Sequence, residues 1–141
     1  MVLPSLPRRI VSLVPSTTET LYAFGCADRV VGVTRFCVHP SEVRELPRVG
    51  GTKDVDIDRV LALEPDLVIG NCEENTREVF DALEGHVPVY AGFPRTVDEA
   101  LEDVSRIGRL LGVELDAARW RAGADKARAD LKQEVAERGF F

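Results

Sequence analysis

The segment that decides the fold is Arg9-Ile10-Val11-Ser12-Leu13-Val14 followed by Pro15-Ser16-Thr17-Thr18-Glu19. Its first part is a short apolar run rich in β-branched residues, which is typical of a buried strand. In its second part, Pro15 ends the strand, and Ser16 with Glu19 matches a capping box that opens a helix. This helix is predicted to end at Gly25. A buried strand that leads directly into a helix predicts a parallel sheet.

The same alternation of apolar runs and helical patterns continues along the chain. Pro88 lacks a backbone N–H, so the last strand, which contains it, is predicted at an edge of the sheet. The predicted fold class is α/β, a Rossmann-like parallel sheet flanked by helices. Gly70 and Asn71 are predicted to turn the chain after the third strand. The further strands are predicted at Val30–Val33, Leu67–Ile69 and Val87–Tyr90.

Helical patterns fill the intervals between the strands and the end of the chain. Short helices are predicted after Asp56 and at about 74–83, and Thr96 with Glu99 forms a second capping box for a helix that reaches Leu111. Asp116 is predicted to cap a long helix that ends at Gly139. We therefore expect an α/β lobe at residues 1–115 and a long helix at 116–138. One apolar stripe on this helix is formed by Trp120, Ala124, Ala127, Leu131 and Val135.

Composition excludes several functional classes. The 141 residues are 45% hydrophobic, which suffices for the core of one domain. Net charge is −6 and no basic run is interleaved with aromatic residues, so nucleic acid is not an expected partner. The three cysteines, Cys26, Cys37 and Cys72, are odd in number and widely spaced, which favours reduced thiols over disulfides.

Ligands of an open parallel sheet bind beyond the carboxyl ends of its strands, where loops replace the covering helices. We call this edge the rim. At Ser16 and Thr17, backbone N–H groups at the start of a helix could hold an anion, although an ordinary helix cap is the favoured interpretation. Arg35 and Arg95 could add charge-assisted hydrogen bonds, or could simply be solvated. The rim segments are 15–18, 35–39, 71–75 and 92–95.

Two further kinds of ligand contact were considered for the rim. Phe36 and Phe93 could offer flat apolar surfaces to a ring-shaped ligand, and a place in the core is an equal alternative. Cys37, His39 and Cys72 carry donor atoms for a soft metal, but they lack the usual spacings. Buried, apolar-like cysteines are therefore favoured over a protein-bound metal.

Catalytic patterns are not recognisable in the sequence. GxSxG, GxGxxG and Walker motifs are missing, and the only histidines are His39 and His86. His86 precedes the fourth strand and so falls at the end of the sheet opposite to the rim. The residues Asp54, Asp56 and Asp58 lack the glycine and glutamate of a calcium loop and are interpreted as a solvated turn. We expect the chain not to be an enzyme; a flavodoxin-like or chelatase-like enzyme or regulatory domain is the alternative.

Four segments carry a resemblance to a known family. They are Arg9–Ser16 with Thr18-Glu19, Val31–Thr34 leading to Pro40, Val49-Gly50-Gly51 through Asp56, and Ile57–Ile69 (IDRVLALEPDLVI). The chain resembles the N-terminal lobe of the helical-backbone metal receptors, the solute-binding proteins of ABC importers for vitamin B12, haem and ferric siderophores. The resemblance implies two α/β lobes joined by one long helix, with the ligand held between them.

This resemblance sets the expectations for function. Residues 116–138 correspond to the inter-lobe helix, and the second lobe is expected to be absent. The implied ligand is a cobalamin, haem or ferric siderophore, with no tightly bound cofactor, and the implied partner is an ABC permease. A homodimer through the long helix is an alternative partner. Because no signal peptide is recognisable, a cytoplasmic or leader-trimmed chain is expected within a periplasmic or lipid-anchored family. The ligand-binding candidates are Ser16, Thr17, Arg35, Phe36, Asn71, Glu73, Phe93 and Arg95.

Overall fold

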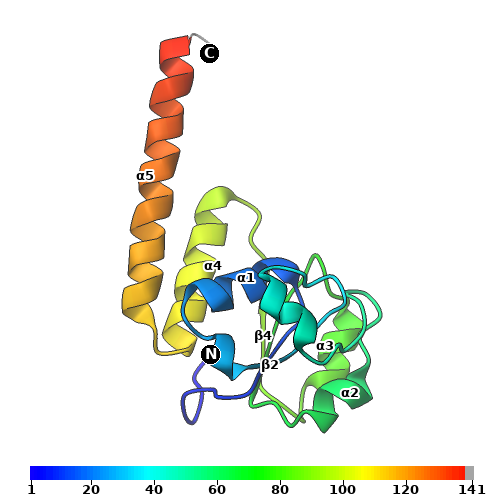
Figure 1. The fold of residues 1–141 in the computed structure, drawn as a ribbon. Coiled ribbons are helices and arrows are strands. Elements are labelled where there is room, and N and C mark those ends of the chain that lie inside the picture. Colours follow the sequence, from blue (N-terminus) through cyan, green and yellow to red (C-terminus); the bar gives the residue numbers. More distant parts are fainter. Residues whose placement is uncertain (139–141) are drawn as a thin grey trace.

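The centre of the protein is a four-stranded parallel sheet with strand order β2-β1-β3-β4, seen in a computed structural model that describes residues 1–138 (Figure 1). The α/β prediction is confirmed, and β4 lies at an edge as Pro88 predicted. All pairings between neighbouring strands are parallel. The strands are β1 (Ile10–Ser12), β2 (Val30–Val33), β3 (Leu67–Asn71) and β4 (Val89–Gly92).

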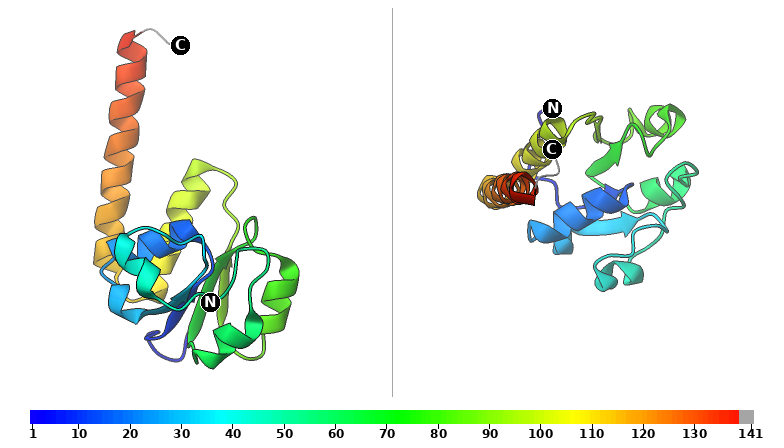
Figure 2. Two further views of the ribbon diagram at one scale, coloured as in Figure 1. Left: turned by 45° about the vertical axis from the view of Figure 1, so that its right-hand side comes forward. Right: turned by 90° about the horizontal axis from the view of Figure 1, so that it is seen from above.

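Helices cover both faces of the sheet (Figure 2). Alternate strand residues point to opposite faces, so Ile10 and Ile69 join one buried cluster while Val11 and Val68 join the other. The first cluster packs under α1, α4 and the start of α5, and the second packs under α2 and α3. The helices are α1 (Pro15–Ala23), α2 (Ile57–Ala62), α3 (Arg77–Leu83), α4 (Val97–Leu110) and α5 (Glu114–Arg138), with 3₁₀ turns η1 (Ala27–Arg29) and η2 (Ser41–Glu45).

The start of α1 differs from the prediction. Val14 is the N-cap and Pro15 occupies the first helical turn, so Ser16 lies inside the helix and makes no capping box with Glu19. Proline suits this position because its φ angle is already helical and its missing N–H would have had no intrahelical partner. The second predicted capping box, Thr96 with Glu99, is confirmed at the start of α4.

The ends of β3 and β4 also differ from the prediction. Gly70 and Asn71 were predicted as a turn, but they extend β3 and pair with Ala91 and Gly92. Consequently β4 begins at Val89, two residues later than predicted. Propensity disfavours glycine in strands, yet here a side chain is excluded, because a Cβ at Gly70 would lie 2.7 Å from the Phe80 ring.

The long helix α5 begins at Glu114, two residues before the predicted cap Asp116. It lies alongside α4 and then continues past the rest of the protein (Figures 1 and 2). The predicted stripe is divided: Trp120 packs against the buried cluster, whereas Leu131 is 60% exposed. Its predicted end at Gly139 lies outside the described residues. Within residues 1–138, no helix has the length and apolar character needed to cross a membrane.

Candidate ligand-binding rim

Four loops follow the carboxyl ends of the strands and form the rim. The strand order places the loop after β2 at one flank and the loop after β4 at the other, with the loops after β1 and β3 between them. Neighbouring strands are about 4.8 Å apart, so the two flanks are separated by roughly 15 Å. The sequence-predicted residues are thus brought to one edge of the molecule, but they do not converge on one point.

The β2 flank carries Arg35 and Phe36. The Arg35 guanidinium lies 5.0 Å from the centre of the Phe36 ring, and Phe36 is 51% exposed. Asp54 also pairs with Arg35, at 3.1 Å, and so partly neutralises its charge. Gly51 leaves room for this arginine, because a Cβ there would lie 2.7 Å from an Arg35 nitrogen. The flank therefore presents an aromatic face backed by a paired cation.

The β4 flank repeats this arrangement with a different charge balance. The Arg95 guanidinium lies 4.7 Å from the centre of the Phe93 ring, and Phe93 is 48% exposed. The backbone N–H of Arg95 donates to the Glu99 carboxylate at 2.7 Å, which fixes the loop. The Arg95 guanidinium takes no part in this hydrogen bond. Within the described residues, Arg95 forms no ion pair. Neither phenylalanine occupies the core.

The centre of the rim is polar, and only some of its polar groups are exposed and free to contact a ligand. Ser16 is exposed, whereas Thr17 is buried, and their N–H groups precede the first intrahelical bond of α1, from Thr18 N–H to the Val14 carbonyl. The Asn71 side-chain oxygen accepts from the backbone N–H of Glu73 at 2.7 Å, so Asn71 builds the turn after β3. Glu73 itself is exposed.

A buried polar network supports the β2 flank and was not foreseen from sequence. The Thr18 hydroxyl lies 2.8 Å from Ser12 Oγ and 3.2 Å from Cys37 Sγ. Arg48 donates at 2.7 Å to the carbonyl oxygens of both Thr34 and Cys37. These contacts tie the loop after β2 to the body. The sequence signal for this network is the pair of small polar residues at the ends of two strands, Ser12 of β1 and Thr34 after β2.

The three residues considered for a metal are not brought together. Cys37 is buried among hydroxyl groups as favoured from sequence, but Cys72 is exposed, so its predicted burial is wrong. In the part of the chain that the structure describes, no group of three or more His, Cys, Asp and Glu side chains could hold a metal ion. His86 lies between α3 and β4, at the end of the sheet opposite to the rim.

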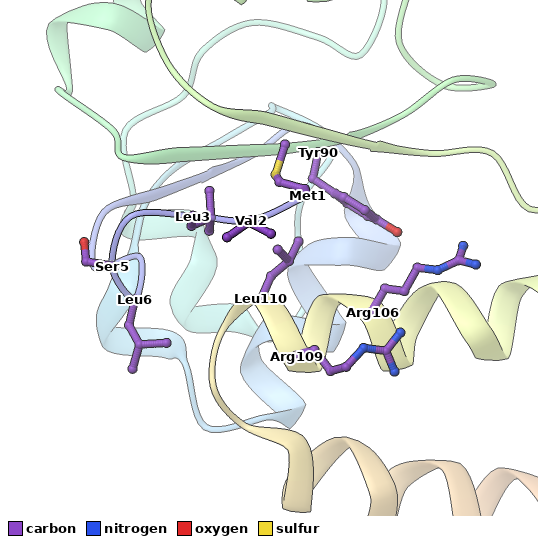
Figure 3. A pocket seen from close by; sticks show the side chains of 9 residues that line it. All are labelled: Met1, Val2, Leu3, Ser5, Leu6, Tyr90, Arg106, Arg109 and Leu110. Carbon is purple, nitrogen blue, oxygen red and sulfur yellow. The ribbon is translucent and has the colours of Figure 1, made fainter.

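A hollow of about 610 Å³ lies elsewhere, between the amino-terminal segment and α4 (Figure 3). Met1, Val2 and Leu110 line its apolar part, and the guanidinium groups of Arg106 and Arg109 lie toward one end. Arg109 is already paired with Glu102 at 3.6 Å. The rim has no comparable hollow beside Phe93, where the cavity is about 170 Å³. A hollow of about 430 Å³ lies beside the loop after β3, where Cys72 and Asn75 line it.

Comparisons with known proteins agree on one family. The family described as "Periplasmic binding protein" matches residues 10–139. The vitamin B12-binding protein of Yersinia pestis (strain Pestoides F) is 30% identical over 102 residues, which are 72% of this chain and 36% of that protein.

Solved structures give the same result. A periplasmic heme binding protein from Pseudomonas aeruginosa superposes with a TM-score of 0.84 at 29% identity, covering 95% of this chain and 50% of that one. The periplasmic vitamin B12 binding protein BtuF of Vibrio cholerae gives 0.82 at 27% identity, with coverages of 92% and 51%. The petrobactin-binding protein YclQ from Bacillus subtilis shares the fold, with a TM-score of 0.88 at 22% identity.

The chain spans about half the length of these structures and about a third of the vitamin B12-binding proteins. The residues that match the family include the parallel sheet, its covering helices and the long helix of this chain. The chain therefore belongs to the periplasmic binding protein family and corresponds to one α/β lobe of its helical-backbone metal receptors.

Proposed function

We propose that this chain is the α/β lobe of the solute-binding component of an ABC-type importer, and that it recognises a metal chelate such as a corrinoid, haem or ferric siderophore. The lobe comprises residues 1–115, and residues 116–138 act as the inter-lobe helix. It binds the chelate without chemical change and presents it to a permease outside the cytoplasm. Its relatives bind vitamin B12 and haem, which supports this ligand class.

The observation that carries the proposal is the pair of arginine–phenylalanine stacks on the rim. Each stack combines an exposed aromatic face with a cation. A ligand that touches both must span roughly 15 Å, the distance across three strand spacings. Large, flat chelates with acidic or amide groups at their periphery meet these requirements, because their rings pack on Phe36 and Phe93 while their edges reach Arg35 and Arg95.

The direction of α5 supports a second wall for the cleft. Arg128 pairs with Asp98 at 2.6 Å, and Asp98 lies in the first turn of α4, directly after the rim loop that carries Phe93. Arg128 is therefore level with the rim. Residues 129–138 continue for about 15 Å beyond it, at 1.5 Å per residue. A body attached to this end of α5 would face the rim and enclose a ligand resting on it.

Titration with known chelates tests the proposal. Hemin and cyanocobalamin, followed by absorbance and by calorimetry, should bind the chain, and the ligand that binds should lose about tenfold in affinity in Arg35→Ala and Arg95→Ala, the loss expected for one charge-assisted contact. Arg77→Ala, an exposed arginine on α3 paired with Asp81, is the matched control and should bind normally.

Two results would reject the proposal. One is failure of the chain to bind hemin, cyanocobalamin or a ferric siderophore. The other is equal affinity in all three arginine variants, which would place the ligand away from the rim. Turnover of the added chelate would instead identify an enzyme.

A further inference from the structure

Asn75 is a buried polar residue directly beneath the rim. It is 2% exposed and lies between the end of β3 and the start of α3. A buried amide is costly unless its hydrogen-bonding groups are satisfied. Its partners therefore indicate what this residue does.

The Asn75 side chain binds backbone atoms of three chain segments, of which the one at Asn71 belongs to the rim. Its Nδ2 donates to the carbonyl oxygen of Leu13 at 3.1 Å and to that of Thr52 at 2.9 Å. Its Oδ1 accepts from the backbone N–H of Asn71 at 3.0 Å. Only one orientation of the amide fits, because two partners are acceptors and one is a donor.

Each of these segments adjoins or supports a candidate ligand-binding residue of the rim. Leu13 lies just before the start of α1 at Pro15, and Asn71 builds the turn that presents Glu73. Thr52 lies two residues before Asp54, which pairs with Arg35. Asn75 thus connects the centre of the rim to its β2 flank.

We propose that Asn75 is the positioning residue of the rim. It fixes three loops relative to one another before ligand arrives, so that less conformational entropy is lost on binding. It acts through the residues that it positions. The expected effect of Asn75 on ligand affinity rests on the proposed function. Its expected effect on hydrogen exchange in the loops does not.

The surroundings of Asn75 are shaped for an amide. A Cβ at Gly70 would lie 2.6 Å from Asn75 Oδ1, so the glycine leaves the space that the amide oxygen occupies. Aspartate at position 75 would have the same shape as asparagine. Its carboxylate, however, would place an oxygen opposite the Leu13 and Thr52 carbonyl oxygens and could donate to neither.

Asn75→Asp is therefore the test variant, and Thr76→Ala is its matched control. Thr76 is the neighbouring residue and caps α3 by accepting from Val79 N–H at 3.3 Å, and its side chain forms no hydrogen bond with Leu13, Thr52 or Asn71. Hydrogen exchange should accelerate about tenfold in segments 50–54 and 71–74 of Asn75→Asp, with the core of β1 unchanged. In Thr76→Ala only α3 should exchange faster.

Hemin and cyanocobalamin binding separates positioning from a purely structural role. We expect Asn75→Asp to bind about tenfold more weakly, and its bound form to regain wild-type protection in segments 50–54 and 71–74. Faster exchange throughout the protein, or loop exchange equal to that of Thr76→Ala, would overturn the inference. If the wild type binds neither compound, the proposed function fails while the exchange result still decides the role of Asn75.

A measurement on the wild type keeps the inference testable even if Asn75→Asp does not fold. The chain contains two asparagines and one glutamine, so its side-chain amides give few NMR signals. The two Nδ2 protons of Asn75 should exchange with solvent at least tenfold more slowly than those of Asn71. Equal rates would show that the hydrogen bonds to Leu13 and Thr52 do not persist, and would reject the inference.

Discussion

The body of the protein and the far end of α5 are built by different forces. In the body, strand residues such as Ile10 and Ile69 are fully buried and pack against helices from both faces. In residues 129–138, hydrogen bonds and ion pairs join only residues of the same helix, such as Glu134 and Arg138 at 2.6 Å. The comparison shows that burial determines the first region and local helix-forming residues the second.

This difference predicts unequal stability along α5. Its base is held by Ala117, which is buried against α4, and by Arg121, which pairs with Glu102 at 3.9 Å. Its far end relies on pairs four residues apart, each worth only about 0.2–0.5 kcal/mol. A segment as short as residues 129–138 forms only a marginally stable helix in water when nothing packs against it. The far end should therefore fray while the base persists, and the following changes test this contrast.

The largest effect is expected from a truncation in the body. Ile69→Ala removes a fully buried side chain from the first cluster and should lower the free energy of unfolding by about 2–5 kcal/mol in urea denaturation. Leu131→Ala, at an exposed position of α5, should change it by less than about 0.5 kcal/mol. Equal losses from the two variants would mean that the far end of α5 is packed against something.

Alanine substitutions at two glycines should have opposite effects on stability. A Cβ at Gly108 would collide with Ala117, so Gly108→Ala should separate α5 from α4 and cost about 1 kcal/mol or more after the gain in helix propensity. At Gly123 the space is open, so Gly123→Ala should stabilise the α5 helix by about 0.5–1 kcal/mol. Circular dichroism and Trp120 fluorescence report both. A stabilising Gly108→Ala would contradict the packing described for α4 and α5.

Alkaline pH should weaken the body selectively. Burial, together with the hydrogen bond to Asp103, raises the pKa of Tyr90 well above its usual value near 10. A raised pKa means that the folded state favours the neutral phenol. The resulting stability is present below about pH 10 and is lost as pH rises above it. Burial also raises the pKa of Tyr22. Tyr90→Phe should therefore reduce, but not abolish, the loss of stability measured between pH 9 and 11.

The smallest effect concerns the contact between the two regions. The hydrogen bond from Arg128 holds the pKa of Asp98 below its ordinary value. Its contribution is present above about pH 4 and is lost as pH falls through the lowered pKa. In Arg128→Gln, an NMR titration should show the pKa of Asp98 rising toward its ordinary value, with Arg121 and Lys132 still lowering it. Stability should change little because both Arg128 and Asp98 are exposed. Lys126→Gln, whose partner is Asp130, should leave the titration of Asp98 unchanged.

Local signals predicted much of the fold. The bounds of β2 and the capping box at Thr96 follow from neighbouring residues alone, and the structure has both as predicted. The cap at Ser16 was wrong because Pro15 occupies the first helical position, which places the N-cap at Val14, two residues earlier. The limits of β4 were wrong because its partner, β3, extends through Gly70, a residue whose propensity opposes a strand.

The rim was predicted only in part, and for a related reason. Arg35, Phe36, Phe93 and Arg95 were located at the rim because they follow predicted strands, and the carboxyl ends of parallel strands share one edge. Arg48 and the Asn75 side-chain nitrogen donate to backbone carbonyl oxygens 11 to 62 residues away. No local pattern records such partners, so these supporting residues emerge only from the folded chain.

The length of α5 beyond its packed base also makes the helix a lever. From Ala117 to Arg138 it measures about 30 Å at 1.5 Å per residue, so a tilt of about 10° at the base would carry its tip roughly 5 Å sideways. Such a tilt requires a small adjustment where Gly108 meets Ala117, close to the pivot, and release of the exposed ion pair between Arg128 and Asp98. Minor repacking between two helices would thus be amplified into a movement larger than a water molecule at the opposite end.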